Sequence, residues 1–319
     1  MAQRVAVIGE NLVDLFVNSE GVITGVVGGG PLNVARTVAR LGGNADFVSG
    51  ISDDIFGRRI REVATADGVH LARPVASPRP TTMALVELSA GDARYHFHLR
   101  DTAAFDVDDV SDLVDVGALY VGTLGLVVAP MADSCLLAVR NADERTLVVL
   151  DPNCRPQATP HREEYVTRII ALCARTDVLK VSVDDLDFLF PGLDPQSGGE
   201  KLREAGARLV VVTDGGEPIR ALVGERWIEV PVAPVAVVDT VGAGDSLVGA
   251  FIVWWLGHDL SRSSLVDESF VDPALRAAVD VSRRTCMVHG AEPPHLDEVL
   301  SEDTWSWART DSSTTPSTP

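Results

Sequence analysis

The sequence is short of positive charge, and that shortage excludes several kinds of partner. Lys and Arg together number 27 against 46 Asp and Glu, so the formal net charge at pH 7 is −19. A chain this acidic has no general attraction for nucleic acid or for anionic lipid. We therefore expect no nucleic-acid partner, and any bound phosphate must be held by local groups and Mg²⁺.

Cysteines and long hydrophobic runs are also scarce. The four cysteines lie far apart and form no C-x-x-C pair, which favours reduced core thiols over disulfides or metal ligands. The longest uncharged apolar segment, 246–257, is too short for a membrane span, which needs about 20 residues. The first apolar run, 5–8, ends at Gly9-Glu10, too soon for a signal peptide. These shortages predict a cytoplasmic protein with no membrane partner.

The sequence does contain a regular alternation of short apolar strands and helical segments. With a helix after each strand, the later strands are predicted at 118–121, 147–150, 178–181 and 209–212. This order is typical of an α/β protein with a mostly parallel, doubly wound sheet and helices on both faces. In such proteins the functional residues lie just after the strand ends.

Two hairpins interrupt this alternation, at roughly 12–27 and 80–100. Both lead away from the predicted main sheet, so we expect them to form a small β-sheet that closes over a site as a lid. The remaining pattern predicts one domain over 1–305. The segment 306–319 is rich in Ser, Thr and Pro, has little to bury, and is predicted to be a disordered tail.

The strongest local signal for chemistry is Asp239-Thr240-Val241-Gly242-Ala243-Gly244-Asp245-Ser246, which leads directly into an apolar helix. Gly242 and Gly244 allow a tight turn at the helix start, where free N–H groups and the helix dipole favour a phosphate. The carboxylate of Asp245 could take a proton from an attacking hydroxyl. An ordinary tight entry into a packed helix would use the same residues, and the segment alone leaves both interpretations open.

Three further positions are candidates for holding a polyol. Asp14 follows the first strand, and the segment 28–33, Gly-Gly-Gly-Pro-Leu-Asn, opens a helix. Its glycines let a small ligand touch the backbone, and Asn33 offers both a donor and an acceptor. The segment has no Lys and matches no nucleotide fingerprint. Arg100, after the second hairpin, could meet an anionic or hydroxyl-rich substrate; Asp14 and Arg100 could equally be solvated turn residues.

The segments 239–245 and 28–33 resemble the two signatures of the ribokinase-like, PfkB-type carbohydrate kinases, and the resemblance extends to about Pro294. It implies a ribokinase-like fold and makes Asp245 the base that deprotonates a sugar hydroxyl. It also implies that backbone N–H groups stabilise the transferring phosphoryl group, and that the sugar is held by a second set of residues. The N–H groups belong to Gly242, Ala243 and Gly244, and the sugar-holding residues are Asp14, Gly29, Gly30 and Asn33.

The resemblance also implies an ATP site at the later strand ends. Asp151-Pro152-Asn153-x-Arg155 looks like a stretch of bacterial fructokinases and ketodeoxygluconate kinases, in which Arg155 would neutralise a phosphate or a sugar-acid carboxylate. Many members have N-x-x-E where this chain has Ser182-Val183-Asp184-Asp185, so Asp185 would influence Mg²⁺ through water. Asp239 lies where a loop for a monovalent cation such as K⁺ would start. The residues implied near the nucleotide are Lys180, Ser182, Thr213, Gly215, Gly216, Gly242 and Gly244.

The leading hypothesis is therefore an ATP-dependent sugar kinase with fructose as its acceptor. A second hypothesis is a kinase for 2-keto-3-deoxygluconate or another sugar or sugar acid, whose carboxylate Arg100 and Arg155 would bind. A third, from another class, is a sugar- or nucleotide-binding regulator without turnover, since function belongs to the site rather than to the fold. Relatives dimerise through the lid, so the resemblance also makes a homodimer a candidate assembly.

Overall fold

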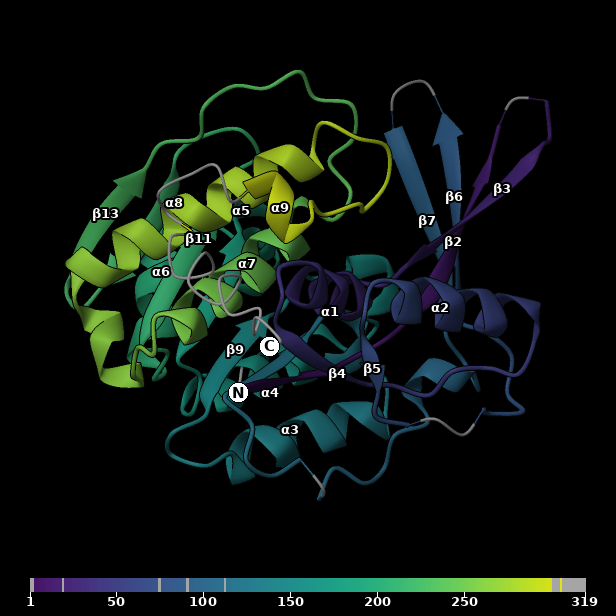
Figure 1. The fold of residues 1–319 in the computed structure, drawn as a ribbon, viewed down its shortest axis with the longest axis horizontal. Coiled ribbons are helices and arrows are strands. Elements are labelled where there is room, and N and C mark those ends of the chain that lie inside the picture. The colour runs from purple at the N-terminus through teal and green to yellow at the C-terminus, as the bar shows by residue number, and fades with distance from the viewer. Residues whose placement is uncertain are drawn as a thin grey trace, which may run out of the picture.

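The computed structural model describes residues 3–18, 20–73, 76–89, 92–111, 113–299 and 305. A nine-stranded sheet forms the body of the molecule, with strand order β13-β12-β11-β10-β9-β8-β1-β4-β5 (Figure 1). Its first seven strands along the chain are parallel. They are β1 (Arg4–Ile8), β4 (Asn44–Val48), β5 (His70–Leu71), β8 (Ala118–Gly122), β9 (Leu147–Asp151), β10 (Val178–Ser182) and β11 (Leu209–Thr213).

Helices cover both faces of this sheet, as predicted. Alternate strand residues point to opposite faces, so Val5 and Val7 of β1 join one core cluster while Ala6 and Ile8 join the other. The first cluster packs under α1 (Gly30–Arg40), α2 (Ile55–Ala66), α7 (Ala243–Gly257) and α8 (Glu268–Thr285). The second packs under α3 (Met131–Asn141), α4 (Arg162–Cys173), α5 (Val183–Leu189) and α6 (Pro195–Glu204). The predicted fold class is confirmed.

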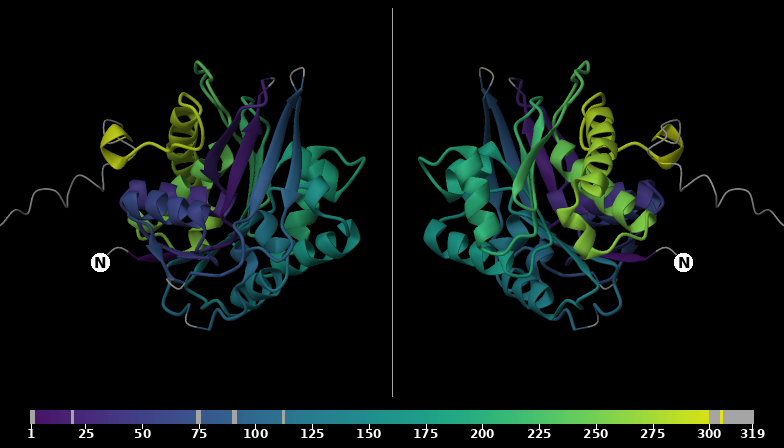
Figure 2. Two further views of the ribbon diagram at one scale, coloured as in Figure 1. Left: turned by 90° about the vertical axis from the view of Figure 1, so that its right-hand side faces the viewer. Right: turned by 90° about the vertical axis from the view of Figure 1, so that its left-hand side faces the viewer.

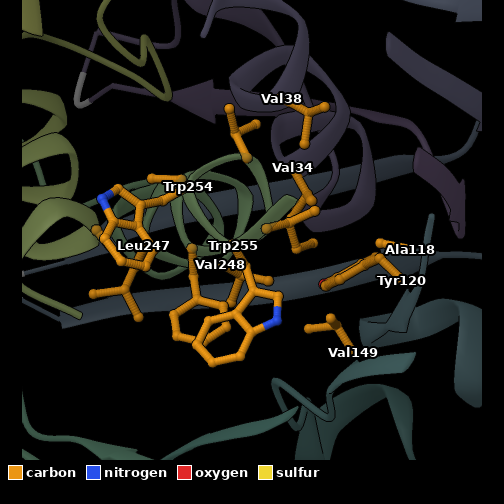
Figure 3. Close-up of a cluster of buried hydrophobic side chains, with 14 of the residues drawn as sticks. Val34, Val38, Ala118, Tyr120, Val149, Leu247, Val248, Trp254 and Trp255 are labelled. Atoms are coloured by element: carbon orange, nitrogen blue, oxygen red, sulfur yellow. The ribbon is translucent and has the colours of Figure 1, made fainter. Parts of the chain in front are cut away.

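The helix that carries the predicted base, α7, lies in the middle of the first core. Trp255 is fully buried and reaches from α7 towards Tyr120 and Val149 of the sheet (Figure 3). Gly249 lets α1 come close, because a Cβ at that position would lie 2.7 Å from the Cβ of Thr37. This close packing of α1 against α7 brings the starts of the two helices together, and both starts carry predicted site residues.

The two hairpins form a separate four-stranded sheet of order β3-β2-β6-β7 that projects from the body (Figures 1 and 2). They comprise β2 (Leu12–Val17) with β3 (Ile23–Gly28), and β6 (Met83–Ser89) with β7 (Asp92–His98). β2 and β6 pair in parallel and join the hairpins. The turn of each predicted hairpin includes residues outside the described ranges. Residues 300–304 and the whole of the predicted tail 306–319 also lie outside them.

Three parts of the fold are not predicted from the sequence. The strands β12 (Ile219–Val223) and β13 (Arg226–Val230) add an antiparallel hairpin at the sheet edge. They depart from the strand-helix alternation that guided the prediction. The helix α8 extends over 268–285, a stretch for which the sequence analysis names no helix, and the segment 286–294 after it is irregular. No helix in the described ranges is long and apolar enough to cross a membrane.

Short elements complete the chain. Four 3-10 turns follow strands or connect helices: η1 (Ala103–Phe105), η2 (Thr123–Leu126), η3 (Pro156–Ala158) and η4 (Arg262–Val266). The helix α9 (Leu296–Val299) closes the described part of the fold, apart from residue 305. Of these, η2 and η3 follow the carboxyl ends of β8 and β9, the edge at which open α/β sheets bind ligands.

Candidate active site

The first turn of α7 places Asp245 in a buried position at the centre of the predicted site. Its N-cap residue, Gly242, has φ 79° and a Cβ there would lie 2.5 Å from the Cβ of Ala291, so the turn requires glycine. The carboxylate Oδ2 of Asp245 accepts a hydrogen bond of 2.9 Å from Nδ2 of Asn33. Asp245 is 7% exposed, and burial raises its pKa against the opposing effects of Asn33, Lys180 and Arg155. A raised pKa makes this carboxylate a stronger base.

The glycine segment before α1 lies directly against Asp245. A Cβ on Gly30 would lie 3.2 Å from Oδ1 of Asp245, and one on Gly28 would lie 2.5 Å from Oδ2 of Asp14. Gly29 has φ 112°, and its missing Cβ would lie 2.7 Å from the main-chain oxygen of Glu10. The three glycines therefore let the backbone approach these two carboxylates and the main-chain oxygen of Glu10 more closely than residues with a Cβ could.

Asn33 has an unused acceptor close to Asp245. Its Nδ2 is bonded to Asp245, but its buried Oδ1 accepts no hydrogen bond from any described residue. An unpaired buried carbonyl costs free energy, and a hydroxyl of a bound sugar would donate to it. The structure thus brings Asp14, Gly29, Gly30, Asn33 and Asp245 together, as the sequence predicts. Their roles toward a sugar stay predictions.

The charged groups Asp14 and Arg155 lie near one another and near a lid residue that the sequence analysis missed. Burial raises the pKa of Asp14 to about 6, and the positive charge of Arg155 opposes that shift. Tyr95 of β7 stacks on Phe97, with ring centroids 5.9 Å apart. Burial, together with the charges of Asp14 and Asp239, raises the pKa of Tyr95. Tyr95 therefore lies within electrostatic range of Asp14, Arg155 and Asp239, on a strand that packs beside η3. Only its position in a hairpin could have indicated this.

The two predicted arginines differ in their surroundings. Nη1 of Arg155 donates to Oδ1 of Asn153 at 2.6 Å and to the main-chain oxygens of Asn153 and Cys154 at 3.1 Å. Arg155 is partly buried, whereas Arg100 lies exposed in the turn after β7. Within the described ranges, no hydrogen bond or ion pair joins Arg100 to the residues around Asp245. Its contact with substrate stays a prediction.

A cavity of about 500 Å³ opens on the other side of the α7 start. Its lining contains Lys180, Thr213, Gly215, Gly216, Ala243 and Gly244, all predicted on sequence grounds to lie near the nucleotide or phosphate. Apolar side chains in the lining include those of 232–235, Val237 and Val279, which the sequence analysis did not name. A concave site with an apolar wall and a few polar groups suits a planar base attached to charged phosphates.

Lys180 is the buried cation of this cavity. Its Nζ lies 3.2 Å from Oδ2 of Asp151, and a Cβ on Gly244 would lie 2.9 Å from the same Nζ. Burial alone would lower the pKa of Lys180, but the carboxylates of Asp151, Asp185 and Asp245 outweigh it and raise that pKa. A protonated amine is therefore held against the helix start, beside the place where a phosphate would bind.

Asp185 and Ser182 have structural partners at the start of α5. The carboxylate of Asp185 accepts from the backbone N–H of Ser182 at 2.7 Å and of Cys154 at 2.6 Å. Oγ of Ser182 accepts in turn from the N–H of Asp185, which completes a capping box. Both oxygens of Asp185 are already used, so this geometry fits influence on Mg²⁺ only through water. That role and the nucleotide contact of Ser182 stay predictions.

Asp239 ties the glycine turn to the segment after α8. Its Oδ1 accepts from the N–H of Val241 at 3.1 Å, and its Oδ2 from that of Gly290 at 2.9 Å. Both carboxylate oxygens therefore order backbone rather than bind a cation directly, and the monovalent cation loop stays a prediction. The described residues contain no group of three or more His, Cys, Asp or Glu side chains placed to hold a metal ion.

The sequence analysis also missed Glu10 and Thr123. Glu10 follows β1 and is 2% exposed; its Oε2 accepts from the N–H of Gly125 at 2.9 Å and its Oε1 from the hydroxyl of Thr123. Burial raises the pKa of Glu10 to about 7, although Thr123, Gly125 and Arg155 oppose the shift. Its position just after a central strand is the signal that could have identified it.

Comparisons with known proteins agree with this geometry. The chain matches the model of the pfkB family of carbohydrate kinases over residues 2–295. It is 31% identical over 306 residues to a fructokinase of Rhizobium leguminosarum bv. trifolii, a match that covers 93% of each protein.

Solved structures show the same likeness. The fructokinase of Xylella fastidiosa with bound ATP has a TM-score of 0.86 and 26% identity, covering 98% of this chain and 100% of that chain. The aminoimidazole riboside kinase of Salmonella enterica, complexed with aminoimidazole riboside and an ATP analog, has a TM-score of 0.80 and 25% identity, covering 93% and 99%. These two relatives are named for different acceptors, so likeness alone does not select the sugar.

Proposed function

Because the chain belongs to the pfkB family of carbohydrate kinases, and is therefore an ATP-dependent phosphotransferase acting on a sugar, we propose that its acceptor is fructose, phosphorylated at a primary hydroxyl. The observation that carries the proposal is the position of Asp245. Its carboxylate faces Gly30 on one side, while its chain neighbour Gly244 lines the 500 Å³ cavity on the other. A base at this junction can meet both reactants.

In the proposed reaction, Asp245 accepts the proton as the sugar oxygen attacks the terminal phosphorus of ATP. Asn33 keeps the carboxylate oriented through its 2.9 Å hydrogen bond. The bond between the terminal phosphorus and the bridging oxygen of ADP breaks as the new bond to the sugar oxygen forms, so the products are sugar phosphate, ADP and a protonated Asp245. Tyr95 and the lid would cover the sugar and exclude competing water.

Charge on the transferring group would be stabilised by the start of α7. We propose that the backbone N–H groups of Gly242, Ala243 and Gly244 point at this charge, and that Lys180 supplements them as a buried cation. Mg²⁺, when bound with the nucleotide, would neutralise phosphate charge, and Asp185 would reach it through water. Thr213, Gly215 and Gly216 would line the nucleotide, and Asp239 would begin a K⁺ loop.

A neutral sugar fits the charges on the acceptor side better than a sugar acid does. Two carboxyl groups, from Asp14 and Asp245, lie directly against the glycine segment. The nearby cation, Arg155, already uses Nη1 in three hydrogen bonds to Asn153 and Cys154. A ligand carboxylate would therefore meet mainly like charge, which disfavours its binding. Fructose carries no charge and presents only hydroxyls.

The decisive experiment is a panel of sugars in an assay that couples ADP release to a measurable signal. Fructose is expected to give the highest kcat/KM, with ribose, an aminoimidazole riboside and 2-keto-3-deoxygluconate lower. A higher kcat/KM with the sugar acid would replace fructose as the acceptor and assign its carboxylate to Arg155. Binding of ATP and sugar without sugar-dependent ADP release would contradict turnover itself.

We further propose that the kinase acts in the cytoplasm. We also propose that a second copy of the chain pairs with β3, the strand at one edge of the lid sheet. β3 is an edge of the four-stranded sheet and carries exposed Val22, Ile23 and Val26 beside or within it. Exposed apolar residues on a sheet edge favour pairing with another chain. Light scattering during size exclusion is expected to give the mass of a dimer, and a monomer mass would contradict the pairing.

A further inference from the structure

We propose that Glu10 is a positioning residue for the sugar wall, a name we give to Asp14, the segment 28–33 and Thr123. Glu10 acts through Thr123, whose methyl group limits the size of the acceptor beside Asp245. This inference rests on the proposed sugar kinase activity, but it concerns two residues that the family signatures do not contain. It is carried by hydrogen bonds, backbone conformation and close approaches at the carboxyl ends of β1 and β8.

The first observation is which hydrogen bonds the carboxyl group of Glu10 accepts. One oxygen accepts from the hydroxyl of Thr123 and the other from the N–H of Gly125, so the group holds the first and third residues of η2. Within the described ranges it forms no ion pair. Burying a carboxyl without an ion pair is costly for a fold, and the two hydrogen bonds offset that cost. The carboxyl of Glu10 is therefore fully engaged in holding η2 in place.

The second observation is the backbone of Thr123. Its φ is 51°, in the left-handed region that a β-branched residue rarely adopts. Such a conformation persists only when the surroundings fix it. The hydrogen bond from the Thr123 hydroxyl to Glu10 provides that restraint. The preceding residue must be glycine, since a Cβ there would lie 2.5 Å from the main-chain oxygen of Asp151.

The third observation is where this conformation aims the Thr123 methyl. Cγ2 of Thr123 lies 2.7 Å from the point that a Cβ of Gly30 would occupy. The same point is 3.2 Å from Oδ1 of Asp245 and 3.5 Å from Nδ2 of Asn153. The methyl, the predicted base and an amide thus converge on the face of one glycine. The methyl shares a wall with the group that would take the sugar's proton.

Glu10 also touches the glycine segment through its backbone. Its main-chain oxygen lies 2.7 Å from the missing Cβ of Gly29, so the residue supports Gly29 directly and Gly30 through Thr123. The sugar wall is therefore braced at two adjacent glycines by one residue. Releasing the side-chain brace should let Thr123 relax and move its methyl relative to Asp245. Neither Glu10 nor Thr123 lines the nucleotide cavity, so releasing this hydrogen bond should leave the affinity of the protein for ATP unchanged.

The test compares Glu10→Gln, Thr123→Val, their double variant and Thr123→Ser with wild type, using the sugar that wild type phosphorylates best. Glu10→Gln and Thr123→Val each disturb the hydrogen bond between the side chains. Each is expected to raise KM for the sugar about 10-fold while KM for ATP is unchanged, the scale of one lost hydrogen bond to a buried group. The double variant should match the single variants, because both changes act through one contact.

Thr123→Ser keeps the hydroxyl and removes only the methyl group. It is expected to retain the wild-type KM for the best sugar within experimental scatter. A ketoheptose has one more carbon, with its hydroxyl, than fructose. The kcat/KM for the ketoheptose, divided by the kcat/KM for fructose, should rise about 10-fold in this variant, which is the discrimination that one carbon provides in a pocket. If the best sugar is not a hexulose, its homologue with one added carbon replaces the heptose.

Asp46→Asn is the matched control, because Asp46 is a buried carboxylate on β4 that pairs with Arg4 and His70. It should change thermal stability without changing KM for the sugar. The inference is overturned if Glu10→Gln behaves as Asp46→Asn does, if both substrates' KM values rise together, or if Thr123→Ser leaves the sugar ratio unchanged. Should Glu10→Gln fail to fold, the two Thr123 variants decide alone. A wild type that phosphorylates no sugar would instead contradict the proposed function.

Discussion

The two walls that meet at Asp245 are built differently. On the sugar side, Glu10, Asn33 and Thr123 are 2%, 5% and 4% exposed, and each is hydrogen-bonded to a residue far away in the sequence. On the nucleotide side, Val237 and Val238 are 61% and 47% exposed. A Cβ added to Gly215 or Gly216 there would meet nothing within 4 Å.

The difference indicates which reactant finds its site already formed. Buried groups with fixed partners do not need to reorganise when a substrate binds, and such preorganisation lowers the barrier of the chemical step. Open backbone and exposed apolar side chains, by contrast, gain contacts only when a ligand covers them. We infer that the sugar wall sets the geometry of the reaction, and that the nucleotide wall mainly supplies affinity. Substitutions on the two walls should therefore have different kinetic effects.

The largest effect should come from the residue between the walls. Asp245→Asn keeps the size of the side chain and removes its ability to accept a proton. It is expected to lower kcat by about 10² or more, the scale of a lost general base. Dissociation constants for sugar and ATP, measured by calorimetry, should stay near those of wild type. Nearly unchanged turnover would show that Asp245 is not the base.

A pair of glycine substitutions compares the walls directly. In Gly30→Ala the new Cβ would lie 2.7 Å from Thr123 and 3.2 Å from Asp245, so the wall must shift. Small displacements of this kind can cost about 10²-fold, and we expect such a fall in kcat/KM for the sugar. Gly216→Ala enters space on the nucleotide side where ATP would bind, so it should alter KM for ATP but change kcat/KM for the sugar at saturating ATP by about 2-fold at most, corresponding to about 0.5 kcal/mol. Equal losses from both variants would remove the distinction between the walls.

Asn33→Ala should have an intermediate effect, and that effect should appear in the binding of the sugar. It removes the donor to Asp245 and the unpaired Oδ1 that we assign to a sugar hydroxyl. KM for the sugar is expected to rise about 10-fold or more, which corresponds to one hydrogen bond to a charged or buried group. Steady-state kinetics with saturating ATP measure this directly. An unchanged KM for sugar would exclude Asn33 from the binding site.

The residues that the sequence reveals differ in kind from those that it conceals. Gly242, Gly244 and Asp245 stand next to one another, and their effect is local: a tight turn, a helix start and a carboxylate in its first turn. Asp14 and the glycine segment could be placed because both follow or open regular elements. The fold class could be predicted for the same reason, since periodic strands and helices carry their own signal.

The concealed features depend on contacts across the chain or on departures from the pattern. Glu10 and Thr123 are 113 positions apart, and their contact requires a left-handed backbone that no threonine predicts. Tyr95 comes near Asp14 and Arg155 only when β7 packs beside η3. The hairpin of β12 and β13 breaks the strand-helix alternation, so pattern reasoning passed over it. Arg36 would be expected on a solvated helix face, yet it is buried and donates to the main-chain oxygen of Ala291.

The last prediction concerns the stability cost of keeping the buried carboxylate of Asp14 charged. Burial raises the pKa of Asp14 from 3.8 to about 6, so the folded protein binds this proton more tightly than the unfolded chain does. Between about pH 4 and 6 the folded state therefore holds more protons, and its stability falls as pH rises through this range. Above about pH 6 the cost is complete, and below about pH 4 it is absent.

Asp14→Asn removes that titration while keeping the shape of the side chain. The variant should melt a few degrees above wild type at pH 7, since one pKa unit corresponds to about 1.4 kcal/mol and 1 kcal/mol shifts Tm by about 2 °C in a chain of this size. The difference in Tm between variant and wild type should shrink as pH falls from 6 and vanish near pH 4. At pH 7 the same variant should bind sugar more weakly, because an amide offers fewer acceptors than a carboxylate. Greater stability together with weaker sugar binding would show that the charged Asp14 lowers the stability of the fold but strengthens sugar binding. A lower Tm at pH 7 would mean that Asp14 instead stabilises the fold, and that its burial reflects packing rather than substrate binding.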